Sequence, residues 1–329
     1  MSQNERCPLA IVILNYRTPG MVIDCLHTLV GQMAPQERVV VVDNLSGDDS
    51  VERITKALSD NDWGSWAELV EAGGNNGFSA GNNVGILAID AETYFLLNSD
   101  TLVRPQALDG LREAIAKHPE ISLFSPRLEW PDGKPQHSVF RDPSPWSEFD
   151  HAAATGPVSR ILRRWAVAPP LVDHPVPFAW ASFAAIVIRR EVFEKIGLMD
   201  EGYFLYFEDI DFCRRARLAG FDSLYWPQSH VVHLRGGSGP VKDSQAKRKR
   251  LPKYYWASRS RILAKSYGRG GLLLANLMWM MGRSISWCRE LVRHKRPHLC
   301  ESEGRDIWHK FSNPVEPEES WQGQFPPRV

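Results

Sequence analysis

LAIVILNYRTP, residues 9–19, is the stretch that decides the fold. It opens with Leu9–Leu14, a continuously apolar run rich in β-branched residues, which is typical of a strand buried on both faces of a parallel sheet. A second such run, Val39–Val42, follows a segment from Pro19 to about Val30 that we predict to be a helix. Strand, helix and strand in this order predict a βαβ unit whose polar loops lie at the carboxyl ends of the strands, where open α/β sheets bind ligands.

Short apolar runs continue this pattern along the chain. We predict strands near Glu68–Glu71 and at Thr93–Leu97, Ile121–Leu128, Ala184–Ile188, Ser223–Trp226 and His230–His233, and helices at Pro105–Lys117 and Glu208–Leu218. Residues 132–177 are rich in proline, tryptophan and charge without clear periodicity, so we expect an irregular excursion that forms a lid. The predicted fold class is α/β, with a mostly parallel central sheet flanked by helices.

Composition limits the kinds of partner. The 329 residues are 43% apolar, which is enough for one large α/β domain with an extension. Lys plus Arg and Asp plus Glu are equal at 39 each, so no overall field selects nucleic acid. The five cysteines are scattered and odd in number, and the first apolar run is too short for a signal-peptide core. We therefore expect reduced thiols and a cytoplasmic protein.

The composition changes near residue 240. A basic run at Lys247–Arg250 leads to the aromatic triplet Tyr254–Trp256 and then to the apolar stretch Gly271–Met281. Arg283 interrupts that stretch before it reaches the roughly 20 residues needed to span a bilayer. We predict a main domain over residues 1–240, a basic and amphipathic helical extension over 241–300, and a polar tail over 301–329.

Polar residues follow the first two predicted strands. Asn15, Tyr16 and Arg17 come after the first, without the glycine-rich fingerprint of a dinucleotide site or the sequence of a P-loop. Asp43 and Asn44 come after the second, where short polar side chains can hydrogen-bond a base and a ribose. The alternative for the second loop is an Asx turn followed by a helix cap.

Two further loops carry candidate ligands. Residues 73–83, GGNNGFSAGNN, contain glycines that let the backbone approach a ligand; the alternative is an ordinary turn into a helix from about Asn82. Ser99 and Asp100 leave the strand at Thr93–Leu97, and a carboxylate there is placed to hold Mg²⁺ or Mn²⁺ against a diphosphate. An isolated aspartate after a strand is, however, more often a turn former.

The last candidates flank the helix predicted at Glu208–Leu218. Asp209 can serve as a general base that takes a proton from an attacking hydroxyl, although acidic residues at a helix start also offset the helix dipole. Tyr206 and neighbouring aromatic residues form either a platform for sugar rings or the edge of a packed core. His233 ends the final strand before Arg235, where it can be a metal ligand, a diphosphate contact or a structural histidine.

Taken together and in this order, these segments resemble the family-two inverting glycosyltransferases with the GT-A fold, particularly the bacterial rhamnosyltransferase-like branch. The motifs are IVILNYR, VVVDNLSGDDS, NNGFSAGNNVGI, FLLNSDT and IGLMDEGYFLYFEDIDFCRRARLAGFDSLYWPQSHVVHLRGGS. They are collinear from about Leu9 to Ser238, and five motifs in one order are far more specific than any single one.

The resemblance assigns a role to each candidate. The nucleotide or donor contacts are Asn15, Tyr16, Arg17, Asp43, Asn44, Asn76, Gly77, Phe78, Asn82, Ser99 and Asp100. Trp180, Tyr206 and Glu208 are expected at the acceptor site, and Asp209 is the catalytic base. Asp100 stands where the family keeps the final aspartate of its metal motif, with Asn98 in place of the first carboxylate, and His233 is its partner for Mg²⁺ or Mn²⁺.

The implied activity is transfer of a sugar from a UDP- or dTDP-sugar, dTDP-rhamnose included, to an acceptor hydroxyl in bacterial cell-surface polysaccharide synthesis. Residues 1–104 would bind the nucleotide sugar and residues 105–240 the acceptor. Two alternatives are a nucleotidyltransferase that makes sugar nucleotides and a non-catalytic module that binds nucleotide sugars or polysaccharides. The first would need a basic, glycine-rich loop after the first strand, and NYRTP lacks one.

The carboxyl-terminal extension suits a saccharide acceptor carried on a lipid at the inner face of the cell membrane. Lys247–Arg250 would meet anionic headgroups, and Leu272, Leu273, Met278, Trp279 and Met280 would enter the interface. The equal alternative is a helix that packs on the main domain or on a second copy in a homodimer.

Overall fold

The computed structural model describes residues 6–235, 241–293 and 298–316 of the chain. Unit 1 comprises Met1–Phe140, Pro170–Glu201 and Asp211–Ser238, and unit 2 comprises Arg141–Pro169, Gly202–Ile210 and Gly239–Val329. This division differs from the predicted boundary at residue 240, because two earlier segments join the carboxyl-terminal part. Gly236, Gly237 and Ser238 of the last motif lie outside the described residues.

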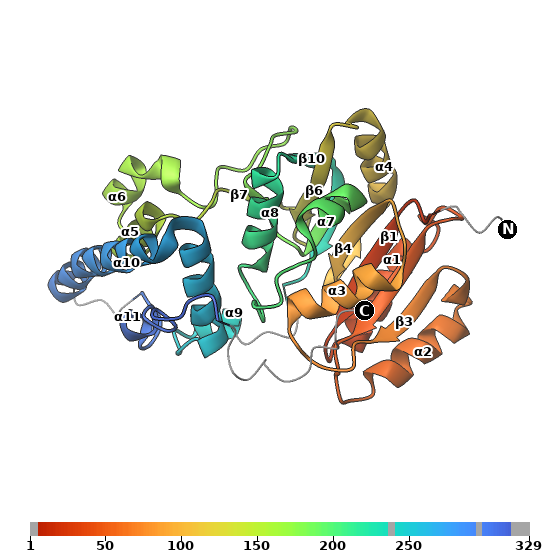
Figure 1. Ribbon diagram of the computed structural model, residues 1–329, viewed down its shortest axis with the longest axis horizontal. Coiled ribbons are helices and arrows are strands. Elements are labelled where there is room, and N and C mark those ends of the chain that lie inside the picture. Colours follow the sequence, from red (N-terminus) through yellow and green to blue (C-terminus); the bar gives the residue numbers. More distant parts are fainter. Residues whose placement is uncertain (1–5, 236–240, 294–297, 317–329) are drawn as a thin grey trace. The chain divides into compact units, whose positions relative to one another are not determined.

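An eight-stranded sheet forms the centre of unit 1 in the described residues, in the order β3-β2-β1-β4-β9-β6-β10-β5 (Figure 1). The strands are β1 (Ala10–Asn15), β2 (Arg38–Asp43), β3 (Ala67–Glu71), β4 (Thr93–Asn98), β5 (Thr101–Val103), β6 (Ile121–Glu129), β9 (Ala185–Arg189) and β10 (Asp222–His233). β9 runs antiparallel to β4 and β6, and β5 runs antiparallel to β10. The other pairings are parallel, so the predicted mostly parallel sheet is confirmed.

Strand register brings the expected loops to one edge. β1 pairs in parallel with β2 and β4, with Asn15 opposite Asp43 and Leu14 opposite Asn98. The carboxyl ends of these three strands therefore lie side by side. The strands are buried on both faces, and apart from Arg38 and Thr93, which begin β2 and β4, their charged, amide and hydroxyl-bearing aliphatic side chains lie where the strands end.

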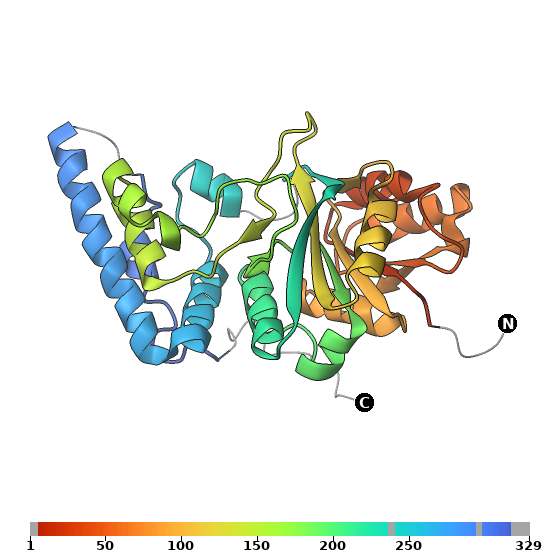
Figure 2. The ribbon, with the colours of Figure 1, turned by 90° about the horizontal axis from the view of Figure 1, so that it is seen from above.

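Helices cover both faces of the sheet. The helices of unit 1 are α1 (Pro19–Leu29), α2 (Ser50–Asp60), η1 (Trp63–Ser65), α3 (Phe78–Ala88), α4 (Ala107–Lys117) and α7 (Arg190–Ile196), together with most of α8 (Glu208–Leu218). α1, α2 and α4 contribute to the core on one face, and α3, α7 and α8 to the core on the other. Figure 2 shows the sheet and these helices from above.

Three sequence expectations need correction. The helix expected from about Asn82 begins at Phe78. The strands expected at Ser223–Trp226 and His230–His233 are one strand, β10, with a register shift between Trp226 and His230. The expected irregular excursion contains β7 (Val139–Phe140), α5 (Pro145–Ala153), α6 (Gly156–Ile161) and η2 (Arg163–Trp165). A proline at N1 or N2 and a Ser144–Ser147 capping box start α5, a local signal that the compositional bias obscured.

Unit 2 is helical. It contains α5, α6, η2, α9 (Val241–Ala246), α10 (Lys253–Arg293) and α11 (Glu303–Asp306). α10 is kinked at Gly268, which has a φ of 70°, and α5 lies alongside it in both views (Figures 1 and 2). No helix in the described part of the chain is long and apolar enough to cross a membrane.

A buried arginine links the two arms of α10 to the rest of unit 2. Arg259, before the kink, forms an ion pair with Glu148 of α5 at 2.5 Å and donates to Asn276 Oδ1, after the kink, at 2.9 Å. Asn276 in turn donates to the Ile307 carbonyl at 3.0 Å. Arg250 and Asp306 form two hydrogen bonds of 2.7 Å each. Residues 301–316 are therefore folded onto unit 2, and residues 317–329 of the expected polar tail lie outside the described residues.

The apolar residues of α10 are not all arranged as the sequence suggested. Leu273 and Met280 are exposed, but Leu272 and Trp279 are buried, so the expectation that these two enter a membrane interface is wrong. Trp279 packs instead in a core with Leu251, Trp256 and Ile307. The sequence identified the apolar stretch, but only the tertiary structure shows which of its residues are buried and which are exposed.

Two glycines let α3 approach the sheet. A Cβ on Gly85 would overlap the Val12 side chain and lie 2.9 Å from Val42 Cγ2, and one on Gly81 would lie 3.3 Å from Asn44 Cγ. Both glycines are on the buried face of α3, one helical turn apart. Their missing side chains therefore set the distance between the helix and strands β1 and β2.

We expect Gly85→Ala to lower the free energy of unfolding by about 1 to 3 kcal/mol, because the added methyl group overpacks the interface between α3 and β1. Urea unfolding of the full chain, followed by circular dichroism, measures this change.

Gly110→Ala is the matched control for that variant. Gly110 is also inside a helix, α4, but a Cβ there would meet its nearest atom at 3.5 Å, which is ordinary contact. Alanine at this position should be neutral or stabilise the protein by up to about 1 kcal/mol. Equal stabilities of the two variants would contradict the close-approach explanation.

Candidate functional site

A hydrogen-bond network joins the ends of β1 and β2. The Asn15 side-chain amide donates to Asp43 Oδ1 at 2.7 Å and to Ser46 Oγ at 3.1 Å. Ser46 donates to Asp43 twice, from its hydroxyl at 2.6 Å and from its backbone N–H at 3.0 Å. Asn15, Asp43 and Ser46 are all buried. This is the Asx turn considered from the sequence, and it holds the loop after β2 in a fixed shape.

The loop after β1 is attached to the same network. Arg17 has a left-handed φ of 58°; its backbone N–H donates to Ser46 Oγ at 2.9 Å and its guanidinium to the Ser46 carbonyl at 2.8 Å. The Arg17 guanidinium also lies 5.2 Å from the centre of the Tyr16 ring. The hydroxyls of Thr18 and Ser99 are 3.0 Å apart, which connects the ends of β1 and β4. Tyr16, Arg17 and Ser99 are therefore neighbours of Asp43 along one edge.

The glycine-rich loop packs against Asn44. The Asn44 amide nitrogen donates to Asn75 Oδ1 at 3.0 Å and to the Gly77 carbonyl at 3.2 Å. Gly77 has a φ of 95°, a conformation that side chains rarely adopt. Asn44 Oδ1 and Ser79 Oγ are buried without a protein partner, and such groups are uncommon in folded proteins. They are candidate contacts for a polar ligand.

Three other predicted donor residues lie in or after this loop. Asn76 and Phe78 are half-buried, at the end of the loop and the start of α3. Asn82 is buried, and its amide donates to the Phe78 carbonyl at 2.9 Å within the helix.

Asp100 and His233 are brought together from distant parts of the sequence. β10 pairs with β5 with His233 opposite Thr101, and the Leu234 N–H donates to the Asp100 carbonyl at 2.9 Å. His233 Nε2 lies 3.5 Å from Asp100 Oδ1, and both side chains are buried. His233 Nδ1 is buried without a protein partner. Gln136 donates to the His233 carbonyl at 2.7 Å and fixes the backbone there.

This pair fits part of a divalent-cation site. The described residues contain no group of three or more His, Cys, Asp or Glu side chains that could hold a metal ion. A carboxylate oxygen and an imidazole nitrogen at 3.5 Å can, however, be adjacent ligands of one ion, with diphosphate oxygens and water as the others. A carboxylate oxygen and an imidazole nitrogen suit Mn²⁺ at least as well as Mg²⁺, because imidazole is a ligand for transition metals.

Glu208 and Asp209 belong to unit 2, where they follow two residues with strained backbone. Tyr206 and Phe207 have left-handed φ values of 73° and 71°, and both rings contact Tyr255, at 5.8 and 5.3 Å between centres. Consecutive non-glycine residues in this conformation are rare and are concentrated at functional sites. The left-handed conformation of these two residues sets the direction in which the chain enters α8.

The two carboxyl groups at the start of α8 have raised pKa values. Burial and the adjacent charge of Asp209 raise the pKa of Glu208 well above its usual range, and Glu208 Oε2 has no protein partner. Burial raises the pKa of Asp209 to about 7, although the Ile210 N–H, which donates to Asp209 Oδ1 at 2.9 Å, opposes this rise. Asp209 is half-buried rather than fully enclosed. A carboxylate with a pKa near 7 is well suited to accept a proton at neutral pH.

Trp180 is in β8 (Trp180–Ala181), which pairs with β7 in unit 1. Its ring stacks on Phe140 with 4.2 Å between centres and 15° between planes. The side chain is half-buried, so this flat aromatic pair presents an edge or face to solvent.

The structure thus groups most of the predicted residues into two sets. Those at the ends of β1, β2, β4 and β10 meet at the carboxyl edge of the unit 1 sheet: Asn15, Tyr16, Arg17, Asp43, Asn44, Ser99, Asp100 and His233. Tyr206, Glu208 and Asp209 form a separate cluster with Tyr255 in unit 2.

Several positioning residues were missed from the sequence. Ser46 and Thr18 hold the strand-end loops, and Gln136 holds the backbone of His233. Asn83, in α3, exchanges two hydrogen bonds of 3.0 Å with the backbone of Met199 and donates to Glu201 at 2.8 Å. Asn83 was within a quoted motif, but Gln136 lies in the segment without periodicity and gave no signal.

The family profile and the similar proteins all point to glycosyltransferases. The sequence profile described as "Glycosyltransferase like family 2" matches residues 7–255. The low-salt glycan biosynthesis hexosyltransferase of Haloferax volcanii is 28% identical over 213 residues, 64% of this chain and 61% of that protein. The N-acetylglucosaminyl-diphospho-decaprenol L-rhamnosyltransferase of Mycobacterium tuberculosis is 28% identical over 186 residues, 52% of this chain and 59% of that protein. The matches thus span about three fifths of these relatives.

Solved structures support the fold. GalNAc-T7 with UDP, GalNAc and Mn²⁺ aligns with a TM-score of 0.55 at 15% identity, over 94% of this chain and 59% of that one. The mannosyltransferase PcManGT of Pyrobaculum calidifontis, with GDP-Man and Mn²⁺, aligns with a TM-score of 0.52 at 13% identity, over 95% of this chain and 86% of that one. At these identities the alignments show the GT-A fold alone. With a family profile that covers most of its length and with this sheet, the chain belongs to glycosyltransferase family 2.

Proposed function

We propose that this glycosyltransferase transfers a sugar with inversion, and that Asp209 is its general base. The observation that carries the proposal is the Glu208–Asp209 pair, in which burial raises the pKa of Asp209 to about 7. A base with this pKa is half ionised at neutral pH and still strong enough to accept a proton from a hydroxyl as it attacks. An exposed aspartate would be ionised but a much weaker base.

The proposed reaction is one displacement. The acceptor hydroxyl oxygen attacks the anomeric carbon of the donor as Asp209 takes the hydroxyl proton. The bond between that carbon and the diphosphate oxygen breaks, and the nucleoside diphosphate leaves with the bonding electrons. Attack opposite the leaving group inverts the anomeric centre and requires no covalent intermediate on the protein.

We propose that the donor is a UDP- or dTDP-sugar, and dTDP-rhamnose is consistent with the rhamnosyltransferase named among the relatives. It would contact the sheet edge of unit 1, where Asn15, Asp43 and Ser46 form a rigid frame. Asn44 Oδ1, which has no protein partner, would accept a hydrogen bond from the nucleotide. Tyr16, Arg17, Asn76, Gly77, Phe78, Asn82 and Ser99 complete the proposed donor site.

Asp100 and His233 are the proposed holders of Mg²⁺ or Mn²⁺. A bound cation at this position would neutralise charge on the leaving diphosphate. Gln136 positions His233 through its backbone, and the pairing of β5 with β10 keeps the two ligands adjacent.

The proposed acceptor is a saccharide, free or linked to a lipid, in the synthesis of a bacterial cell-surface polysaccharide. The decaprenol-linked substrate in the name of the M. tuberculosis relative supports a lipid-linked acceptor. Trp180, Tyr206 and Glu208 are proposed to contact it. A lipid-linked acceptor would place the protein in the cytoplasm, at the inner face of the cell membrane. Membership of a glycosyltransferase family argues against a nucleotidyltransferase. A non-catalytic binding module would release no nucleoside diphosphate from donor and acceptor.

We expect Asp209→Asn to lower the rate of sugar transfer at least about 100-fold, because the amide cannot accept the proton. In the wild type, kcat/KM should rise with pH up to about 7 and level off above it, since only the ionised Asp209 acts as base. Release of nucleoside diphosphate from donor and acceptor across pH 5.5–9 measures both effects. Near-normal turnover of the variant would remove the assignment.

A stability measurement separates this role from misfolding. The raised pKa means that the folded protein carries a costly buried charge above pH 7, and that this cost disappears as pH falls toward 4. Asp209→Asn should therefore melt at a higher temperature than the wild type at pH 8, and the difference should shrink at acidic pH. Asp222→Asn, which changes an exposed carboxylate at the start of β10, is the control and should alter neither activity nor melting.

Nucleotide binding gives a separate test of the donor and metal site. UDP or dTDP should raise the melting temperature of the wild type, and Mn²⁺ should increase that shift, because ligands of the folded form stabilise it. In Asp100→Asn we expect the nucleotide shift to remain and the Mn²⁺-dependent part to disappear.

Asp48→Asn is the control for the metal experiment, because Asp48 is an exposed carboxylate in the loop after β2. It should keep the full Mn²⁺ increment. An unchanged increment in Asp100→Asn would reject Asp100 as a metal ligand, and no shift with any nucleotide would favour a protein that is not a transferase of this kind.

A further inference from the structure

The second arm of α10, residues 269–293, packs into unit 2 through small and polar side chains as well as through Leu272 and Trp279. Gly282 faces α5 so closely that a Cβ there would lie 2.9 Å from the Ala153 backbone nitrogen. Ala275, Asn276 and Ser286 are also buried on this side. A helix on the surface of a water-soluble protein ordinarily buries its apolar side and exposes its polar side. This arm buries Leu272 and Trp279 together with these small and polar residues, and it also leaves a large part of its apolar surface exposed.

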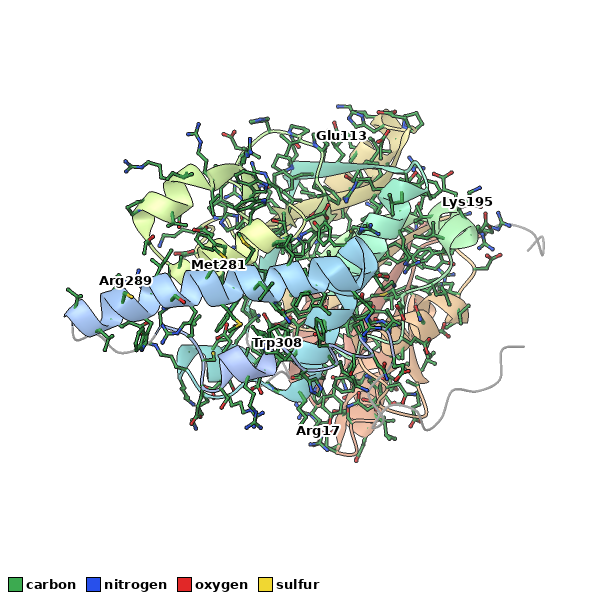
Figure 3. The ribbon with its side chains drawn as sticks, turned by 60° about the vertical axis from the view of Figure 1, so that its left-hand side comes forward. Arg17, Glu113, Lys195, Met281, Arg289 and Trp308 are labelled. Atoms are coloured by element: carbon green, nitrogen blue, oxygen red, sulfur yellow. The ribbon has the colours of Figure 1, made fainter. Side chains whose placement is uncertain are left out.

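The opposite side of the arm is apolar and exposed. We define the outer face of α10 by Leu274, Leu277, Met281, Ile285, Leu291 and Val292, which are between 40% and 83% exposed. Leu274, Leu277, Met281 and Ile285 recur every three or four residues, and the exposed Cys288 continues this spacing to Val292, so they form one strip over about five helical turns. Figure 3 shows α10 from the side, with Met281 and Arg289 labelled. Contiguous apolar surface of this kind marks an interaction site.

The charges beside this strip have one sign. Arg269, Arg283 and Arg289 are the basic residues of the arm between residues 269 and 292, and Glu290 is its single acidic residue. Glu290 is buried and pairs with Arg283 at 2.8 Å. The outer face therefore presents no carboxylate to a partner.

A basic cavity opens next to the outer face. Its volume is about 1220 Å³, and Met280, Ser284 and Trp287 of α10 line one wall. Lys247, Arg248, Arg283 and Arg305 line it as well, against the carboxylates of Glu301 and Glu303, and Lys247 also pairs with Asp243 at 2.6 Å. Glu303 is buried, accepts from the Cys300 N–H at 2.9 Å and lies 3.5 Å from His151. The exposed Trp287 is thus placed between the apolar strip and a cationic recess.

We propose that the outer face of α10 docks on a lipid bilayer and that the adjoining cavity takes the phosphate headgroup of an anionic phospholipid. Apolar side chains would enter the boundary between headgroups and acyl chains, with tryptophan and arginine at headgroup level. This surface is distinct from both sets of proposed site residues, and the inference depends on unit 2 alone, not on the transfer reaction.

The shape of the strip favours a bilayer over a second copy of the chain. A coiled-coil seam uses two positions in each heptad, flanked by charged residues that pair across the interface. Here Met280 and Trp287 on one side and Ile285 and Val292 on the other widen the apolar surface beyond such a seam. The flanking charges are arginines, which would repel each other in a symmetric pair but match an anionic membrane.

Flotation with vesicles tests the proposal. The full chain should bind vesicles of phosphatidylcholine with one quarter phosphatidylglycerol at least about tenfold better than pure phosphatidylcholine vesicles, and the preference should weaken with added salt. The double variant Leu277→Asp, Met281→Asp should lose binding to both. The double variant Lys247→Gln, Arg305→Gln should lose the preference for the anionic vesicles.

Ile161→Asp is the matched control, because Ile161 is also an exposed apolar residue of unit 2, at the end of α6, and lies outside the outer face. It should bind vesicles as the wild type does. Absence of vesicle binding, or equal binding by the Leu277/Met281 variant, would overturn the proposal. So would a concentration-dependent dimer that this variant dissociates, if the wild type ignores vesicles. Transfer to a water-soluble acceptor should be unchanged in all variants, so the result is independent of the proposed catalytic role.

Discussion

Burial of β1, β2 and β4 on both faces is the constraint on which the rest of unit 1 depends. Strands covered by helices on both sides can carry almost no polar side chains along their length. Polar chemistry is therefore confined to the points where the chain leaves the sheet, and parallel pairing puts three of those points at one edge. The Asn15–Asp43–Ser46 network occupies that edge and holds the loops after β1 and β2 together, and the Thr18–Ser99 contact joins the loop after β4 to them.

Unit 2 follows a different physical rule. Its helices are held by buried polar contacts as well as by the apolar core around Trp279, with Arg259 joined to Glu148 on α5 and to Asn276 beyond the kink of α10. These contacts satisfy one another, and α10 leaves Leu277 and Met281 exposed while it buries Leu272 and Trp279. The cluster of Tyr206, Glu208 and Asp209 belongs to this unit, where burial raises the pKa of Asp209. The two units thus supply different chemistry, polar hydrogen bonding in one and a raised carboxyl pKa in the other.

Much of the fold could be predicted because its signals are local. The apolar runs of β1, β2 and β4 and the polar residues after them are each visible within about ten residues of sequence. The excursion at residues 132–177 was misjudged because proline and tryptophan masked a capping box that starts α5. The bulge in β10 was missed because a register shift depends on the neighbouring strand rather than on the strand itself.

The sequence by itself determined the sheet, the candidate polar residues and the family, because hydrophobic periodicity and ordered motifs are properties of the linear chain. Tertiary structure alone decided which distant residues meet, as His233 and Asp100 do through the pairing of β10 with β5. It also decided that Gln136 supports His233, that Trp279 is buried and that Met281 is exposed. The physical reason is that burial, pKa and contact depend on the neighbours of a side chain in space, and those neighbours come from other segments of the chain.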